Sequence, residues 1–234
     1  MPGLAQAARP AVRQSPPMKN IVILISGGGS NMAAIVRASQ QQDWARRYGA
    51  RVAAVVSNKA KASGLVFARE QGIATEVLDH RPFPSREAFD AELAQVIDRH
   101  APALVVLAGF MRILTPGFVQ HYSGRLLNIH PSLLPKHKGL HTHQRALEAG
   151  DTEHGCSVHF VTEELDGGPL VVQAVLPVLA DDTAERLASR VHQQEHRIYP
   201  LAVRWFAEGR LRLGAQGAML DGQPLPASGH LIRT

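Results

Sequence analysis

Two polar side chains at the end of an apolar run are the first feature that could do chemistry. The stretch LLNIHPSLLP, residues 126–135, carries Asn128 and His130 two positions apart. Successive side chains alternate across a strand, so we expect both groups on the same side. A carboxamide can donate a hydrogen bond to a developing oxyanion, and an imidazole can take and give protons near neutral pH. The pair therefore suits chemistry at a carbonyl group.

A third candidate is Asp166, which lies in the tight turn LDGGP. A carboxylate beside an imidazole can orient the ring and stabilise its charged form. Together, Asn128, His130 and Asp166 suit acyl transfer to an amine, with Asn128 holding the carbonyl oxygen and His130 moving protons between the two nitrogens. The alternative is that the three residues only end a strand, precede a proline and form a turn. Their convergence is a prediction.

A glycine-rich loop, SGGGSN at residues 26–31, lies between an apolar run and a helical pattern. Free backbone N–H groups and the helix dipole form an anion site at such a point. The loop lacks the lysine of a Walker sequence, and Met32 stands where a dinucleotide fingerprint has its third glycine. These features favour a phosphate monoester over NAD or ATP. An ordinary turn in which Ser30 or Asn31 caps the helix is the alternative.

Other reactive side chains have simpler interpretations. Cys156 lies in a predicted strand and is interpreted as a small core residue and not as a nucleophile. His137, His141 and His143 match no known zinc spacing, and a polar loop explains them. We therefore expect no metal.

Apolar runs alternate with helical patterns from residue 20 onward, as βαβ units require. Valine- and leucine-rich runs indicate strands buried on both faces of a parallel sheet, and two apolar runs around EELDGG predict an antiparallel addition. We predict an α/β fold, a doubly wound and mostly parallel sheet with an antiparallel C-terminal addition. The expected strands are 21–25, 52–56, 74–78, 103–109, 125–129, 156–162 and 170–178, and the expected helices are 32–39, 64–72, 85–100, 141–150 and 184–209, the last kinked near Pro200.

Composition restricts the class of protein. The chain has 234 residues, of which 45% are hydrophobic, and this suits one domain. The net charge of +5 is scattered, which favours small anionic substrates over nucleic acid. One cysteine and the lack of an apolar run of membrane-spanning length indicate a cytoplasmic protein with no membrane partner. We expect residues 1–17 to be a disordered tail, 18–226 a single catalytic domain and 227–234 a C-terminal tail.

Four sequence blocks occur in an order that is typical of one known family. They are NIVILISGGGSNM, VVLAGFMRILTPGF, GRLLNIHPSLLPKHKGLHTHQRALEAGDTEHGCSVHFVTEELDGGPLVVQA and QEHRIYPLAVRWF. The chain from residue 19 to about 226 resembles the phosphoribosylglycinamide formyltransferase family, the folate-dependent glycinamide ribonucleotide transformylases. HPSLLP and LDGGP are shared with the wider formyltransferase superfamily, whereas ISGGGSN and GLHTH resemble the purine enzyme specifically.

The resemblance implies a Rossmann-like fold and a reaction. A formyl group would pass from 10-formyltetrahydrofolate to the amine of 5'-phosphoribosylglycinamide in purine (IMP) biosynthesis, without a metal or covalent intermediate. His130 would be the proton donor, Asn128 the ligand of the formyl oxygen and Asp166 the residue that favours protonated His130.

The resemblance also implies binding residues for two small-molecule substrates, in a monomer or homodimer. Arg86 and Arg112 would pair with the glutamate tail of folate, and Glu195 would attract the ammonium group of the nucleotide. Implied nucleotide contacts are Gly29, Ser30, Asn31, His192, Gln193, Gln194 and Glu195. Implied folate contacts are Arg86, Met111, Arg112, Ile113, Leu114, Asn128, Thr162, Glu163, Glu164, Leu165 and Asp166.

Three other functions are alternatives to formyl transfer to the nucleotide. A formyltetrahydrofolate hydrolase would use water in place of the amine and would not need a phosphate loop, and we expect it to carry an N-terminal regulatory domain. A methionyl-tRNA formyltransferase would carry a C-terminal RNA-binding domain. A binding module would keep the fold without chemistry, and the presence of Asn128, His130 and Asp166 argues against it.

Overall fold

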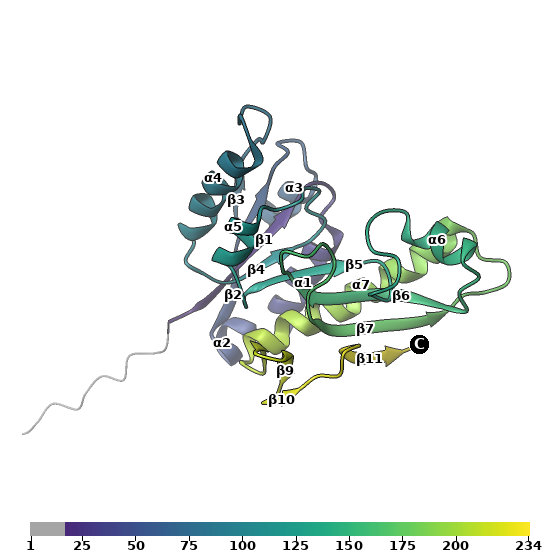
Figure 1. The fold of residues 1–234 in the computed structure, drawn as a ribbon. Helices are drawn as coiled ribbons and strands as arrows, with labels where there is room; N and C mark the ends of the chain where they lie inside the picture. Colours follow the sequence, from purple (N-terminus) through teal and green to yellow (C-terminus); the bar gives the residue numbers. More distant parts are fainter. Residues whose placement is uncertain (1–16) are drawn as a thin grey trace, which may run out of the picture.

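The computed structural model describes residues 17–234, and a large central sheet organises it (Figure 1). Its strands are β1 (Lys19–Ile25), β2 (Ala50–Ser57), β3 (Ala74–Val77), β4 (Pro102–Leu107), β5 (Leu126–His130), β6 (Glu153–Phe160), β7 (Leu170–Pro177) and β11 (His230–Arg233). They lie in the order β11-β7-β6-β5-β4-β1-β2-β3. Only β6 runs antiparallel to its neighbours, β5 and β7. The predicted mostly parallel sheet with an antiparallel addition is confirmed.

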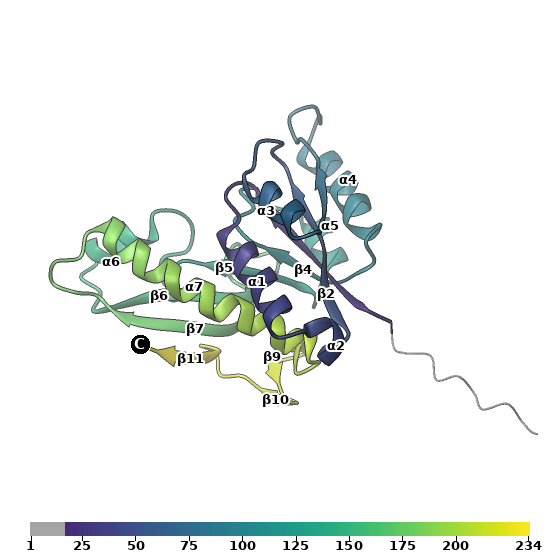
Figure 2. The same cartoon turned by 180° about the vertical axis from the view of Figure 1, so that it is seen from behind.

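Helices cover both faces of this sheet, as Figures 1 and 2 show from opposite sides. The helices are α1 (Ser30–Gln41), α2 (Trp44–Tyr48), α3 (Gly64–Glu70), α4 (Arg86–Asp98), α5 (Pro116–His121), α6 (Thr142–Glu148) and α7 (Ala184–Ala207). Alternate residues of β1 divide between two cores. Ile23 packs in the cluster that contains residues of α1, α3 and α7, whereas Leu24 packs in the cluster that contains residues of α4 and α5. Burial of both strand faces explains the continuous apolar run.

The long helix α7 ties the central strands together. It continues through Pro200 to Ala207, and its first turn is capped by Thr183, whose hydroxyl oxygen accepts from the N–H of Arg186 at 3.2 Å. The buried hydroxyl of Tyr199 is 2.7 Å from the carbonyl oxygen of Leu107 and 3.0 Å from that of Leu127. A buried phenol needs such a partner. One side chain therefore holds β4 and β5 at the level where the candidate catalytic residues begin.

The C-terminal segment contains more structure than the sequence indicated. After α7, strands β8 (Leu211–Gly214), β9 (Gly217–Leu220) and β10 (Gln223–Pro224) form a small antiparallel sheet. Residues 227–234, which we expected to be a tail, include β11, which pairs in parallel with β7. A four-residue edge strand with mostly exposed side chains leaves no clear hydrophobic pattern.

Two expectations concern the ends of the chain and its environment. The tail expected at residues 1–17 lies, except for Pro17, outside the described residues. Between residues 17 and 234, no helix combines the length and apolar character needed to cross a membrane. The domain limits stay predictions.

Candidate active site

The glycine-rich loop and the segment that contains Met111 follow β1 and β4, the two strands between which the strand order reverses. From β1 the chain proceeds to β2 and β3 on one side and later to β4 and β5 on the other. Ligands of open α/β sheets bind in the crevice at such a switch point. Here the N–H of Ser26 donates to the carbonyl of Gly109 at 3.1 Å, so the loops after β1 and β4 are directly joined.

His130 and Asp166 meet in the structure. His130 is the last residue of β5, and its Nδ1 lies 3.6 Å from Oδ2 of Asp166. Both side chains are largely buried, at 9% and 8% exposure. Asp166 has a φ of 49°, a left-handed conformation that aspartate tolerates better than most residues. The carboxylate and the imidazole therefore lie side by side in a weakly solvated part of the site.

Asn128 lies on β5, and its side chain contacts His159, a residue that the sequence did not indicate. Its Nδ2 is 3.3 Å from Nε2 of His159, which faces it across the β5–β6 pair. Nδ1 of His159 donates to the carbonyl of Phe160 at 2.9 Å, so Nε2 is the acceptor and the amide of Asn128 donates. Burial lowers the pKa of His159, which keeps the ring neutral.

This arrangement leaves the second N–H of the Asn128 amide available for an oxyanion. His159 therefore orients the carboxamide. No pattern along the chain marks His159, because only the strand register brings it opposite Asn128.

Both ring nitrogens of His130 face acceptors. Nε2 lies 3.0 Å from the carbonyl oxygen of His137, to which it donates, and Nδ1 faces Asp166. Asp166 in turn accepts from the N–H of Gly139 at 2.9 Å. Two acceptors on opposite sides of the ring suit an imidazolium, whose nitrogens are both donors.

The glycine-rich loop and α7 form a second cluster. Ser30 Oγ lies 2.9 Å from Nε2 of His192, and Nδ2 of Asn31 donates to Oε2 of Glu195 at 2.9 Å. Nδ1 of His192 lies 3.0 Å from the same carboxylate oxygen, and this hydrogen bond raises the pKa of His192. The structure thus joins two segments more than 160 positions apart. Oδ1 of Asn31 is buried without a hydrogen-bond partner among the described residues.

The start of α1 does not match the alternative in which the side chain of Ser30 or Asn31 caps the helix. Gly29 is the N-cap residue, with a φ of 66°, and neither Ser30 nor Asn31 caps the helix with its side chain. The first turn contains no acidic residue. The free N–H groups at this end therefore face no acidic side chain of the helix's own first turn, and the nearby carboxylate of Glu195 is paired with Asn31 and His192.

Gly29→Ala is expected to lower the free energy of unfolding by about 1–3 kcal/mol, because an L residue is strained at this φ. An added Cβ would also come within 3.3 Å of the Gly64 backbone. Urea denaturation measures the effect. Gly27→Ala is the matched control, since a Cβ there meets nothing within 4 Å. Equal stability of the two variants would contradict the strain argument.

One segment expected to bind folate, residues 111–114, follows β4 and contacts the loop after β1. The N–H of Met111 donates to Ser26 Oγ at 2.8 Å, and Ser26 Oγ donates to Asn58 at 2.6 Å. The side chains of Met111, Ile113 and Leu165 are exposed, although they are large and apolar. Exposed apolar side chains on neighbouring loops are typical of a binding surface.

The expected folate arginines differ in their surroundings. The guanidinium of Arg112 lies over the ring of Phe89 at 4.8 Å, and its Nε is buried without a hydrogen-bond partner among the described residues. Arg86 begins α4 on the surface. Glu164 pairs with Lys138 at 2.6 Å, and Gln194 accepts from Arg197 at 2.9 Å. Four candidate residues stand apart from the others. Within residues 17–234, their side chains form no hydrogen bond or ion pair with another candidate site residue: Arg86, Thr162, Glu163 and Gln193.

The remaining histidines and the cysteine make separate contacts. His137 pairs with Asp151 at 2.7 Å, and Nδ1 of His143 lies 3.0 Å from Nε2 of His154. Cys156 is fully buried in the core, as expected, and burial raises the pKa of its thiol. Within residues 17–234, no three histidine, cysteine or acidic side chains are grouped as metal ligands would be.

Stability is expected to fall between pH 6.5 and 5 because of His154. Burial lowers its pKa to about 4 in the folded protein, against an ordinary value of 6.5. A depressed histidine pKa stabilises the folded state above pH 6.5, and this contribution is lost as the pH falls towards 4. Urea midpoints at pH 6.5 and 5 should show a loss of about 1 kcal/mol that His154→Gln reduces. The same loss in both proteins would contradict this assignment.

The family model described as formyl transferase matches residues 19–203, and the chain belongs to this family. The phosphoribosylglycinamide formyltransferase of Escherichia coli (strain K12) is 59% identical over 211 residues, which are 90% of this chain and 98% of that protein. The predicted family resemblance is confirmed.

Other relatives agree. The phosphoribosylglycinamide formyltransferase from Coxiella burnetii has a solved structure with a TM-score of 0.85 and 51% identity, covering 93% of this chain and 100% of that chain. The trifunctional purine biosynthetic protein adenosine-3 of Homo sapiens is 42% identical over 84% of this chain, which matches 19% of its length. Nothing in these names supports the hydrolase alternative.

Proposed function

We propose that this enzyme transfers the formyl group of 10-formyltetrahydrofolate to the amine of 5'-phosphoribosylglycinamide, a step of purine biosynthesis. The observation that carries the proposal is the contact between His130 and Asp166 at the carboxyl end of β5, two residues after Asn128 on the same strand. The names of the relatives support the acceptor substrate. 10-Formyltetrahydrofolate supplies, when bound, a formyl carbonyl that an amine can attack.

Asn128 holds the oxygen of that carbonyl. Its amide is oriented by His159 and donates to the oxygen as negative charge develops in the tetrahedral intermediate. Because the amide is oriented before the reaction, little reorganisation is needed when the charge appears.

His130 moves the protons. As an imidazolium it donates to the departing folate nitrogen, and it then accepts a proton that originates on the attacking amine. Nδ1 stays beside Asp166, and Nε2 shares its N–H between the carbonyl of His137, which keeps the ring in place, and the substrate nitrogen. Asp166 stabilises the charged ring and keeps its orientation.

The cluster at the start of α1 binds the nucleotide. The N–H groups that follow Gly29 and the hydroxyl of Ser30 hold the phosphate, and protonated His192 adds a positive charge. Glu195, which Asn31 and His192 hold in place, attracts the ammonium form of the acceptor.

The loops after β4 and β6 bind the folate. Met111, Ile113 and Leu165 expose apolar surface that fits a flat ring system, and the buried, unpartnered Nε of Arg112 marks a guanidinium with hydrogen-bonding capacity left. We assign Arg112 and Arg86 to the carboxylates of the glutamate tail. No role is assigned to a metal.

A spectroscopic assay of the folate product, with and without the ribonucleotide, tests the proposal. Product that forms only with the nucleotide is expected. Product in water alone would mean hydrolysis, and no product under either condition would mean a binding module; both outcomes would contradict the proposal.

Three further expectations remain proposals. The partners are the two small-molecule substrates and neither nucleic acid nor membrane. The enzyme acts as a monomer or homodimer. We propose a cytoplasmic location, in keeping with its one cysteine, Cys156, which is a buried free thiol.

A further inference from the structure

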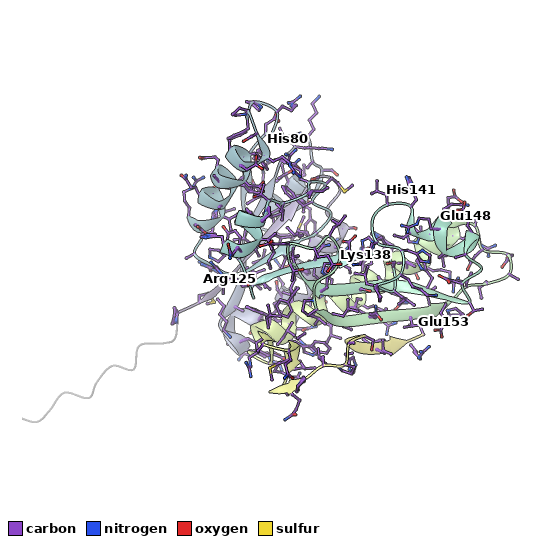
Figure 3. The ribbon with its side chains drawn as sticks, viewed as in Figure 1. His80, Arg125, Lys138, His141, Glu148 and Glu153 are labelled. Atoms are coloured by element: carbon purple, nitrogen blue, oxygen red, sulfur yellow. The ribbon has the colours of Figure 1, made fainter. Side chains whose placement is uncertain are left out.

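A partly buried carboxylate, Asp151, holds two consecutive residues of the loop between β5 and α6. Asp151 lies in the short connection between α6 and β6, and Figure 3 labels Glu148 and Glu153 on either side of it. Its Oδ2 lies 2.7 Å from Nε2 of His137, and its Oδ1 lies 2.8 Å from Nζ of Lys136. We call Lys136, His137 and Asp151 the Asp151 clasp.

The two arms of the Asp151 clasp differ in exposure. The side chains of Asp151 and His137 are only 12% and 13% exposed, whereas that of Lys136 is 61% exposed. An exposed ion pair contributes little because solvent screens it, whereas a hydrogen bond withdrawn from water is stronger and geometrically restrictive. The His137 arm is therefore the one that fixes the loop.

The same residue, His137, contacts the candidate catalytic histidine through its backbone. Its carbonyl oxygen accepts from Nε2 of His130 at 3.0 Å. His137 has a φ of 53°, a conformation that a non-glycine residue keeps only when its surroundings impose it. The preceding residue is also held, because the hydroxyl of Ser132 donates to the carbonyl of Lys136 at 2.6 Å.

We propose that Asp151 is a positioning residue for formyl transfer, which acts through His137 to fix the orientation of the His130 ring. The carboxylate of Asp151 binds the ring of His137 and so fixes the position of that residue. The backbone carbonyl of His137 then holds Nε2 of His130. This inference rests on the proposed function of His130 and assigns to Asp151 no contact with substrate.

The geometry indicates the size of the effect. A shift of the His137 carbonyl by about 1 Å would break its hydrogen bond with His130, since such bonds weaken steeply beyond normal length. Misplacement of a catalytic group by this amount can reduce a rate by about a hundredfold. Only part of the positioning depends on the clasp, because Asp166 and the backbone of β5 also hold His130. We expect kcat to fall by about tenfold.

Kinetics of five variants test the proposal. Asp151→Ala and His137→Ala should each lower kcat about tenfold with KM for both substrates changed less than about twofold, and the double variant should be no worse than either single one. His137→Gln, which can still donate to Asp151, should restore most of kcat. Lys136→Met removes only the exposed arm and should leave kcat unchanged.

A spectroscopic readout separates the clasp from the reaction. The imidazole ¹⁵N signals of His130, identified by their loss in His130→Ala, should shift in Asp151→Ala and remain in place in Asp181→Asn, which removes an exposed pair with Arg186. Unchanged His130 signals in folded Asp151→Ala would overturn the inference whatever the enzyme catalyses. If Asp151→Ala does not fold, the comparison of His137→Ala with His137→Gln decides in the same way.

Shifted signals with unchanged kcat would overturn the positioning role. Activity lost in His130→Ala while the Asp151 variants stay at full rate would refute the clasp alone. A full rate in His130→Ala would instead refute the proposed function.

Discussion

His130→Ala is expected to lower kcat by about a thousandfold, the largest effect of any single substitution in this enzyme. The variant loses the imidazole whose Nδ1 lies 3.6 Å from Asp166, and alanine has no group that can give or take a proton. Binding of both substrates should persist, because the nucleotide cluster on α1 and α7 and the folate loops are untouched. Steady-state formylation and calorimetric binding measure the two effects.

His121→Ala is the matched control for this substitution. His121 lies on α5 and pairs at 2.7 Å with Asp98, on the surface and outside the candidate site. Its replacement should leave kcat within about twofold, as for most exposed residues away from a site. An unaltered rate in His130→Ala would remove His130 from the mechanism.

Asp166→Asn is expected to lower kcat by about a hundredfold. Asparagine keeps an acceptor for the N–H of Gly139 but removes the negative charge that lies 3.6 Å from Nδ1 of His130. The loss should therefore lie in kcat more than in KM, and single-turnover formylation can separate the chemical step from binding.

Asp221→Asn controls for the loss of an acidic group, because Asp221 pairs with Arg210 at 2.7 Å beyond α7. It should retain the full rate. A similar loss in both variants would indicate a general effect on the fold and would contradict the role assigned to Asp166.

Most of the fold could be predicted from the sequence because its strands are buried on both faces. The run at 21–25 has no polar alternation, and this identifies a strand of a doubly wound sheet. The edge strand β11 could not be predicted, since four mostly exposed residues carry too little pattern. The helix expected over 184–209 corresponds to α7, because its apolar residues keep helical spacing on both sides of Pro200.

Only part of the candidate site could be predicted from the sequence. Asn128 and His130 could be paired from strand alternation alone, and the anion loop from its glycines and position. A carboxylate beside His130 could be expected on chemical grounds, but its contact with Asp166 is seen only in the structure. His159 and Asp151 could not be found, because strand register and a loop contact bring them to the site.

A crystal structure with the ribonucleotide and an unreactive folate analogue bound tests the central claim most directly. We predict that the amide of Asn128 and the ring of His130 lie within about 3 Å of the atoms that stand for the formyl oxygen and the folate nitrogen. Asp166 should remain beside His130. An Asp166 carboxylate more than about 6 Å from the His130 ring, with both ligands in place, would contradict the mechanism.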